Sequence, residues 1–340
     1  MIFGPVLLAQ ASGATLAHSV RAGGRMLKKG AILTDSDLAA LADAGIVRVM
    51  VARLEPSDVP EDEAAHALAT AARGPGLRIA PPTTGRCNLH AEAAGLLRVD
   101  ARAVDAANAL DEALTIATPP DFARLEAGQL AATAKVIPYA APRAMLDRAT
   151  VALDGALVLH PFAPLRAALI VTRTETLKPS VIDKGIRAVT DRLVSLGSPL
   201  PDVRTVDHDD AALTGAIREA MDLAPDLLLI LAATATSDRR DLAPAALVAA
   251  GGTVERFGMP VDPGNLLVLA RIGAIPAIVL PGCARSPALN GADWVLERLA
   301  ARLPVTGADI ARMGVGGLLK EMPGRPHPRE RPARPRERPE

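Results

Sequence analysis

Aromatic side chains are scarce in this chain of 340 residues, which has four Phe, one Tyr and one Trp. Proteins that bind single-stranded nucleic acid stack its bases on several exposed rings, so this composition excludes that class. Charge of one sign is also lacking, because 38 Lys and Arg balance 38 Asp and Glu. A formal net charge of zero argues against any polyanion, nucleic acid included, as the main partner.

Cysteine is almost absent, with Cys87 and Cys283 alone in the sequence. Two cysteines are too few for a disulfide framework or a four-cysteine zinc site, and this usage is typical of the reducing cytoplasm. The longest strongly apolar run, 227–233, is far shorter than the roughly 20 residues that span a bilayer. Residues 1–14 are apolar but lack the positively charged start of a signal peptide. We therefore expect a cytoplasmic protein that does not bind membranes.

The length predicts two domains, at about 100–200 residues each, and the pattern changes between residues 163 and 164. Residues 323–340 are a third kind of segment, with six Pro, six Arg, three Glu and no large apolar residue. Such a segment cannot bury enough apolar surface to become ordered, so we predict a disordered tail. Its charge of +3 leaves −3 on the rest of the chain.

From residue 164 to 322, short apolar runs alternate with segments of helical spacing, which predicts an α/β domain with a mostly parallel sheet. The expected strands are 167–171, 203–206, 226–233, 266–270 and 277–280, and the expected helices are 181–196, 209–221, 243–250 and 289–303. Residues 1–163 instead read as an α+β region whose topology we cannot derive, with helices expected at 36–44, 61–72 and 141–153.

In an open α/β sheet, ligands collect beyond the carboxyl ends of the strands. Three loops follow such ends, at 172–176, 234–241 and 280–287, and they contain Arg173, Arg239, Arg240 and Arg285. Guanidinium groups, hydroxyls and backbone amides at a helix start together hold anions, so we expect a small phosphorylated or anionic ligand. The alternative is that the polar residues of the second loop merely organise the turn into the next helix. The neighbouring run 207–210 (DHDD) reads as a solvated helix start rather than a metal site.

Residues 240–282 contain RDLAPAAL, AGGTV, GMPVDPG and PAIVLPG, in that order. In order and spacing, these motifs resemble the molybdopterin-binding domain of molybdopterin adenylyltransferases and molybdotransferases, over about residues 165–305. Residues 18–33 resemble accessory regions of the larger molybdotransferases. The whole chain is similar to the front part of bacterial fusions with a nucleotidyltransferase domain, through TGRCNL (84–89), PGCARSP (281–287) and MGVGGLLKE (313–321).

The resemblance implies a three-layer molybdopterin-binding domain at 164–322, preceded at 1–163 by accessory domains. It implies molybdopterin or its nucleotide as the ligand and Glu175 and Asp241 as catalytic residues, the acidic groups nearest to any Mg²⁺ or molybdate. Mg²⁺ and molybdate are further cofactors to be tested, and no metal ligand is assigned. The expected partners are a nucleotidyltransferase or a molybdoenzyme maturation factor, together with further copies of the chain. The implied cofactor-binding residues are Thr172, Arg173, Thr174, Thr234, Thr236, Ser237, Asp238, Arg239, Arg240, Pro263, Gly264, Asn265, Pro281, Gly282, Cys283, Arg285 and Ser286.

The sequence departs from the family pattern at several of these positions. Arg173 replaces a Gly, the loop 233–237 lacks the usual glycines, and Asn265 stands where a Lys is common. A loop without glycine has fewer backbone conformations with which to approach a phosphate. Two hypotheses therefore stand: a transferase of the molybdotransferase or adenylyltransferase type, and a non-catalytic carrier or regulatory module that serves a nucleotidyltransferase. A third is an α/β domain with another nucleotide ligand.

Overall fold

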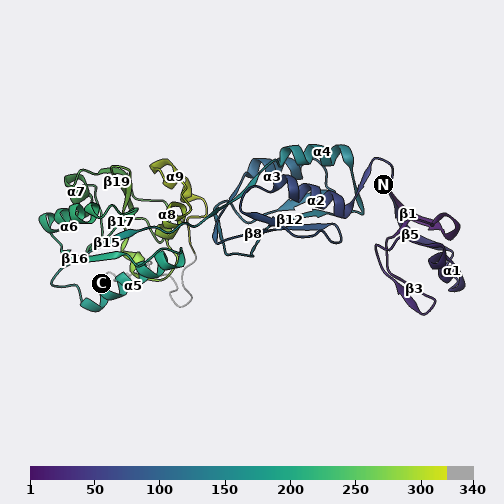
Figure 1. The fold of residues 1–340 in the computed structure, drawn as a ribbon, viewed down its shortest axis with the longest axis horizontal. Coiled ribbons are helices and arrows are strands. Elements are labelled where there is room, and N and C mark those ends of the chain that lie inside the picture. The colour runs from purple at the N-terminus through teal and green to yellow at the C-terminus, as the bar shows by residue number, and fades with distance from the viewer. Residues whose placement is uncertain (320–340) are drawn as a thin grey trace, which may run out of the picture. The chain divides into compact units, whose positions relative to one another are not determined.

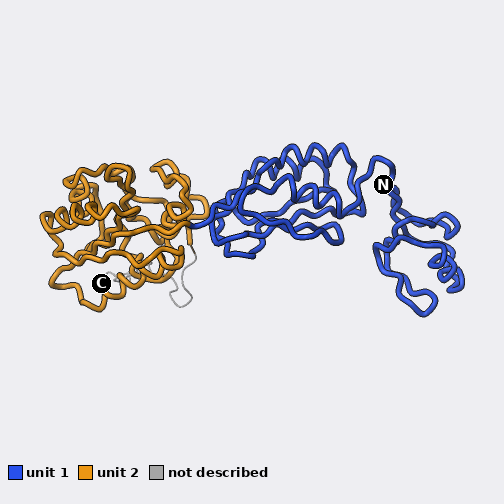
Figure 2. The backbone as a smooth tube through the Cα atoms, in the orientation of Figure 1, with its two compact units in different colours: residues 1–162 blue, residues 163–340 orange. Residues whose placement is uncertain are grey.

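The computed structural model describes residues 1–319, so the predicted tail at 323–340 lies outside the described residues. The chain divides into two compact units, residues 1–162 and residues 163 onward (Figure 2). This division falls one residue before the boundary that the sequence suggests. None of the helices described is both long and apolar enough to cross a membrane.

A six-stranded sheet forms the centre of the second unit, in the order β16-β15-β17-β20-β19-β18 (Figure 1). Neighbouring strands are parallel from β16 to β20 and antiparallel from β20 to β18. The α/β class and the mostly parallel sheet are thus confirmed. The strands are β15 (Ala167–Arg173), β16 (Asp202–Asp207), β17 (Leu227–Leu231), β18 (Thr253–Phe257), β19 (Val268–Ile272) and β20 (Ile275–Val279).

Helices cover both faces of this sheet. On one face, α6 (Asp210–Asp222) and α7 (Leu242–Ala249) pack on alternate apolar residues of β15, β17, β19 and β20. On the other face lies α5 (Pro179–Ser195), which an ion pair between Arg192 and Asp293 joins to α8 (Gly291–Ala300). Strand β17 is buried along its whole length, as a continuous apolar run in a parallel sheet requires.

Among the strands and α-helices described in this unit, β18 and the short helix α9 (Gly307–Ala311) were not expected from the sequence. Strand β18 lies at the edge of the sheet, none of its side chains is fully buried, and its register shifts between Val254 and Arg256. An irregular, half-exposed edge strand gives little apolar periodicity to detect. The turn between β19 and β20 is also tighter than expected, with only residues 273 and 274 between the strands.

The first unit contains several small antiparallel sheets and four α-helices. Its N-terminal part comprises β1 (Ile2–Leu7), β2 (Thr15–Leu16), β3 (Val20–Ala22), β4 (Arg25–Leu27), α1 (Asp35–Asp43) and β5 (Arg48–Arg53). The remainder comprises β6 (Asp58–Pro60), α2 (Glu61–Ala72), β7 (Leu77–Ile79), β8 (Arg86–Ala91), β9 (Gly95–Val99), α3 (Ala101–Asn108), β10 (Leu114–Ala117), β11 (Ala123–Leu125), β12 (Leu130–Val136), β13 (Ala140–Pro142), α4 (Arg143–Ala152) and β14 (Leu157–Pro161).

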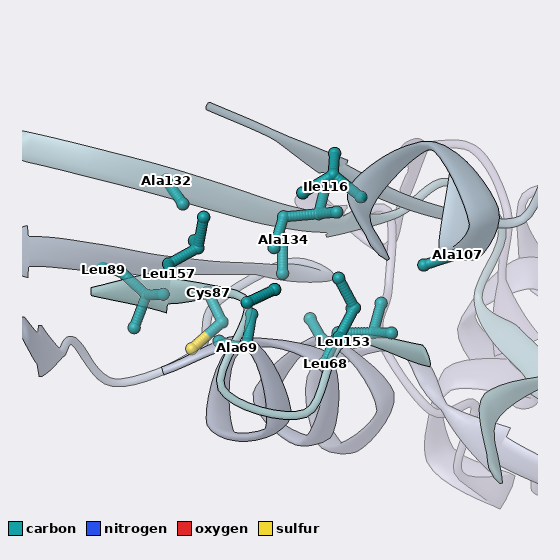
Figure 3. Close-up of a cluster of buried hydrophobic side chains, with 14 of the residues drawn as sticks. Leu68, Ala69, Cys87, Leu89, Ala107, Ile116, Ala132, Ala134, Leu153 and Leu157 are labelled. Carbon is teal, nitrogen blue, oxygen red and sulfur yellow. The ribbon is translucent and has the colours of Figure 1, made fainter. Parts of the chain in front are cut away.

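The core between α2 and the sheet of β8 and β12 is built from small residues. Ala64, Ala65, Ala69 and Ala72 of α2 are completely buried. Because these side chains are short, the helix backbone can approach the strands closely without aromatic filling. Figure 3 shows this contact, with side chains of α2, β8 and β12 directed into one cluster that includes Leu68, Ala69, Cys87, Leu89, Ala132 and Ala134.

Candidate functional site

The predicted loops of the second unit meet at one edge of its sheet, which we call the strand-end edge. The carboxyl ends of β15, β16, β17 and β20 lie there because these strands are parallel. The connection between β18 and β19 lies at the same edge, since Phe257 pairs with Val268 and Val268 with Val279 at the end of β20. The topology thus brings residues 172–176, 207–209, 234–241, 258–267 and 280–287 to a common side of the molecule.

A pocket of about 480 Å³ opens at this edge, beyond the ends of β15 and β16. The Nε of Arg173 lies 2.8 Å from Oδ1 of Asp207, and both side chains are more than half exposed. The pocket is lined by Arg173, Thr174 and Glu175 from the first predicted loop and by Asp207, His208 and Asp209 from the end of β16. The last three residues were not among the predicted site residues.

The lining is more acidic than the sequence suggested. Glu175, Asp207 and Asp209 contribute three carboxylates, against one guanidinium that is already paired with Asp207. Asp209 is partly engaged, because its Oδ1 accepts a hydrogen bond of 2.9 Å from the Ala212 amide and so caps α6. The lining of this pocket is therefore mainly acidic, and it is not the arginine-rich anion site that the sequence suggested.

His208 connects three strand ends. Its Nδ1 lies 2.8 Å from the Thr172 hydroxyl, and its Nε2 lies 3.0 Å from the Thr234 hydroxyl. Thr172 is fully buried, and the amide of Ala233 donates to the same hydroxyl at 2.7 Å. The run 207–210 is the exposed start of α6, as expected from the sequence, with Asp209 as the N-cap. His208 differs from its neighbours in this run, because its half-buried ring links the ends of β15 and β17.

The charged side chains of the loop 234–241 bond within the loop or to β18. Oδ2 of Asp241 accepts hydrogen bonds from the backbone amides of Ser237 and Asp238. Arg240 donates to Oδ1 of Asp238 at 2.9 Å, which holds the pKa of that carboxyl below its usual value. Arg239 extends away to the carbonyl of Val254 on β18. These residues organise the turn into α7, as the alternative reading proposed, and the pocket lining does not include them.

In the loop 280–287, Arg285 points back to the sheet. Its Nη2 donates to the carbonyl of Ala232, just after β17, at 2.5 Å, while its buried Nε has no hydrogen-bond partner among the described residues. Burial lowers the pKa of this guanidinium. The side chain runs along α5, where a methyl group at Gly185 would lie 3.2 Å from its Cγ.

Arg192 of α5 holds this loop and was missed by the sequence analysis. Its side chain is almost completely buried and donates to Asp293 and to the carbonyls of Ala284, Ser286 and Ala288. No local signal distinguishes such an arginine within an amphipathic helix. The other predicted residues of the loop, Pro281, Gly282, Cys283 and Ser286, lie outside the pocket lining.

The PGN sequence at 263–265 packs against α8. Gly264 has a φ of +139°, and a methyl group there would lie 2.7 Å from the Gly291 nitrogen. The carbonyl of Pro263 accepts a hydrogen bond of 2.9 Å from the same nitrogen. Asn265 is exposed at the strand-end edge. The glycine thus serves close packing at the start of α8, and these residues too lie outside the pocket lining.

Comparisons with known proteins add two kinds of likeness. A family model described as a domain of unknown function (DUF8806) matches residues 5–53, and no curated protein matches the chain. A molybdopterin biosynthesis moea protein from Pyrococcus horikosii is similar at 16% identity and a TM-score of 0.33, over 72% of this chain and 79% of that one. A molybdenum cofactor biosynthesis protein from Pyrococcus furiosus is similar at 12% identity and a TM-score of 0.25, over 89% of this chain and 64% of that one, so this chain spans less than two thirds of its length. At these values, neither likeness assigns the chain to a family.

Proposed function

We propose that the strand-end edge of the second unit binds molybdopterin or its nucleotide. The observation that carries this proposal is the pocket of about 480 Å³ at the ends of β15 and β16, which lies at the same edge of the sheet as the loops that carry the family-like motifs. Its volume lies within the range of roughly 300–1,000 Å³ that is usual for small-molecule sites. The sequence resemblance supplies the ligand class, and the pocket supplies the groups that would recognise it.

The acidic lining favours a ligand that has both hydrogen-bond donors and an anionic group. The aminopyrimidinone edge of a pterin carries N–H donors, and ionised carboxylates such as Glu175 and Asp207 accept hydrogen bonds. The Nε of Arg173 donates a hydrogen bond to Asp207, and no residue among 1–319 accepts a hydrogen bond from its two Nη groups. Those groups can bind the phosphate at the rim of the pocket. A free phosphate alone fits this pocket less well.

The contacts of Asp241 favour the non-catalytic alternative, a carrier or regulatory module, over a transferase. Its Oδ2 already stabilises the loop through two backbone amides, and its side chain is outside the pocket that Glu175 lines. Residues 1–319 contain no group of three or more His, Cys, Asp or Glu placed to hold a metal ion, so we derive no step through Mg²⁺. In this proposal, the chain presents the pterin to a nucleotidyltransferase or a maturation factor in the cytoplasm.

Fluorescence titration of the purified chain with molybdopterin under anaerobic conditions tests the binding. We expect Asp207→Asn to weaken binding by about tenfold, equivalent to about 1.4 kcal/mol, through loss of one charge-assisted hydrogen bond. Asp202→Asn is the matched control, because Asp202 lies at the opposite end of β16 and is also paired with an arginine, Arg204. Absence of binding to the unchanged chain refutes the proposal, and equal effects of the two variants place the ligand elsewhere.

Release of AMP from adenylylated molybdopterin, in the presence of molybdate and Mg²⁺, separates the two hypotheses. We expect binding without release, as for a carrier. Release that is abolished by Glu175→Gln would instead establish the molybdotransferase activity and assign this carboxylate to it.

A further inference from the structure

A pocket also lies in the first unit, on the outer face of a small sheet whose other face packs on the core. In the sheet β11-β9-β14, Val158 pairs with Arg98, and His160 pairs with Leu96. Paired residues and their second neighbours share one face of an antiparallel sheet. Leu97, Leu157 and Leu159 belong to the core cluster on the opposite face. Arg98, Val158 and His160 therefore lie on the outer face.

This pocket has a volume of about 470 Å³ and lies where β9 ends, α3 begins and the chain enters β14. Arg98, Arg102 and His160 supply its basic and hydrogen-bonding groups, and Val99, Ala156 and Val158 supply much of its apolar wall. Asp100 is its one carboxylate. The balance of charge is thus opposite to that of the pocket at the strand-end edge.

The carboxylate of Asp100 is already used to cap α3. Its Oδ1 accepts hydrogen bonds from the backbone amides of Arg102, at 3.0 Å, and Ala103, at 3.1 Å. The amides of Arg102 and Ala103 are therefore satisfied, and the basic side chains of the pocket are the groups that we consider for a ligand.

The side chain of Arg98 is held in place, whereas those of Arg102 and His160 are not. The Nε of Arg98 donates to Asp121 at 2.9 Å, and its guanidinium lies 4.2 Å from the centre of the Phe122 ring. Within residues 1–319, neither the guanidinium of Arg102 nor the imidazole of His160 has a hydrogen-bond or ion-pair partner. Burial, and then the charge of Arg98, lower the pKa of His160, so its ring is neutral at pH 7 and offers one N–H donor.

We propose that this pocket binds the phosphate group of a small phosphorylated molecule. Arginine binds phosphate through two parallel N–H donors. Asp121 and Phe122 orient the guanidinium of Arg98 before a ligand binds, and the exposed Arg102, in the first turn of α3, supplies a second guanidinium. The imidazole of His160 donates a further hydrogen bond. The apolar wall around Val158 then contacts the uncharged part of the ligand. This site is independent of the function proposed for the second unit.

NMR titration of the full chain with inorganic phosphate, at constant ionic strength, tests the proposal. The imidazole signals report on each histidine, and His160→Gln assigns the signal of His160. We expect phosphate to shift this signal and to raise the pKa of His160, because a dianion stabilises the imidazolium form. The signals of His18, His66, His90 and His208 should not shift, since these residues lie outside the pocket.

Arg102→Ala should weaken the binding of phosphate at least fivefold. Arg78→Ala is the matched control, because Arg78 is an exposed arginine of the same unit outside the pocket lining. A thermal denaturation of each variant verifies that it is folded. Equal phosphate affinity in the two variants, or equal shifts at every histidine, would overturn the proposal.

Discussion

The Nδ1 of His208 lies 2.8 Å from the Oγ of Thr172, a side chain that solvent does not reach. The same hydroxyl accepts a hydrogen bond from the Ala233 amide, so its own proton needs an acceptor in a buried place. Nδ1 is that acceptor, which puts the ring proton on Nε2, where it donates to Thr234. One imidazole ring thus connects the ends of β15, β16 and β17.

Two substitutions of His208 separate these hydrogen bonds. Asn at this position can place a carbonyl oxygen near the site of Nδ1, whereas Gln can place an N–H near the site of Nε2. We expect His208→Asn to retain most of the stability and His208→Gln to lower the free energy of unfolding by about 1–3 kcal/mol, because the Thr172 hydroxyl loses its acceptor. Urea denaturation measures both changes. A loss in His208→Asn as large as that in His208→Gln would show that the contact between Nδ1 and Thr172 does not dominate the contribution of His208 to stability.

The sequence identified the strand-end edge but not the side chains that line its pocket. Alternating strands and helices place the loops 172–176 and 234–241 at the same edge, and this follows from local periodicity. Local periodicity does not predict the direction in which each side chain of these loops points. Arg239 bonds to β18, a strand that the periodicity did not reveal, and His208 is distinguished from its polar neighbours only by the hydroxyls it meets across the sheet.

In the first unit, helices were easier to predict than strands. Helix α2 begins with three acidic residues and then repeats Ala and Leu at helical spacing, and its observed bounds, Glu61–Ala72, are those expected. No strand was expected at β8, yet Cys87 and Leu89 are buried there and alternate with the less buried Asn88 and His90. An alternation this short identifies a strand only once the pairing with β12 is known.

Two helix glycines with different surroundings provide a second prediction. A methyl group at Gly215 of α6 would meet nothing within 4 Å, whereas one at Gly185 of α5 would lie 2.7 Å from Leu231 Cδ2. We expect Gly215→Ala to raise the free energy of unfolding by about 0.5–1 kcal/mol, because alanine costs less backbone entropy in a helix. Gly185→Ala should lower it by about 1–3 kcal/mol through overpacking against β17 and Arg285. Urea denaturation of both variants checks these signs, and stabilisation by Gly185→Ala would show that α5 is less closely packed than described.

The two thiols should differ strongly in reactivity. Cys87 has no exposed surface and its Sγ donates to the Ala80 carbonyl at 3.3 Å; burial, and then the charge of Asp62, raise the pKa of this thiol. Cys283 is only half-buried. Because the thiolate is the reactive form, a colorimetric thiol reagent should modify Cys283 in the folded chain and Cys87 only after denaturation. Rapid labelling of a folded Cys283→Ser variant would contradict this expectation.

Stability should fall below neutral pH through His160. Burial, and then the charge of Arg98, lower the pKa of this imidazole in the folded chain, whereas an unfolded histidine titrates near pH 6.5. The unfolded chain therefore takes up the proton first, so the stabilisation present above about pH 6.5 is lost as the pH falls toward the folded pKa.

His160→Gln has no proton to take up at this position, and the free energy of unfolding of the unchanged chain should decrease relative to that of the variant between about pH 7.5 and about pH 5. Urea denaturation across this range measures the difference in phosphate-free buffer, since a bound dianion would raise the folded pKa and weaken the effect. A difference that stays constant with pH would mean that folding does not disfavour the charged ring.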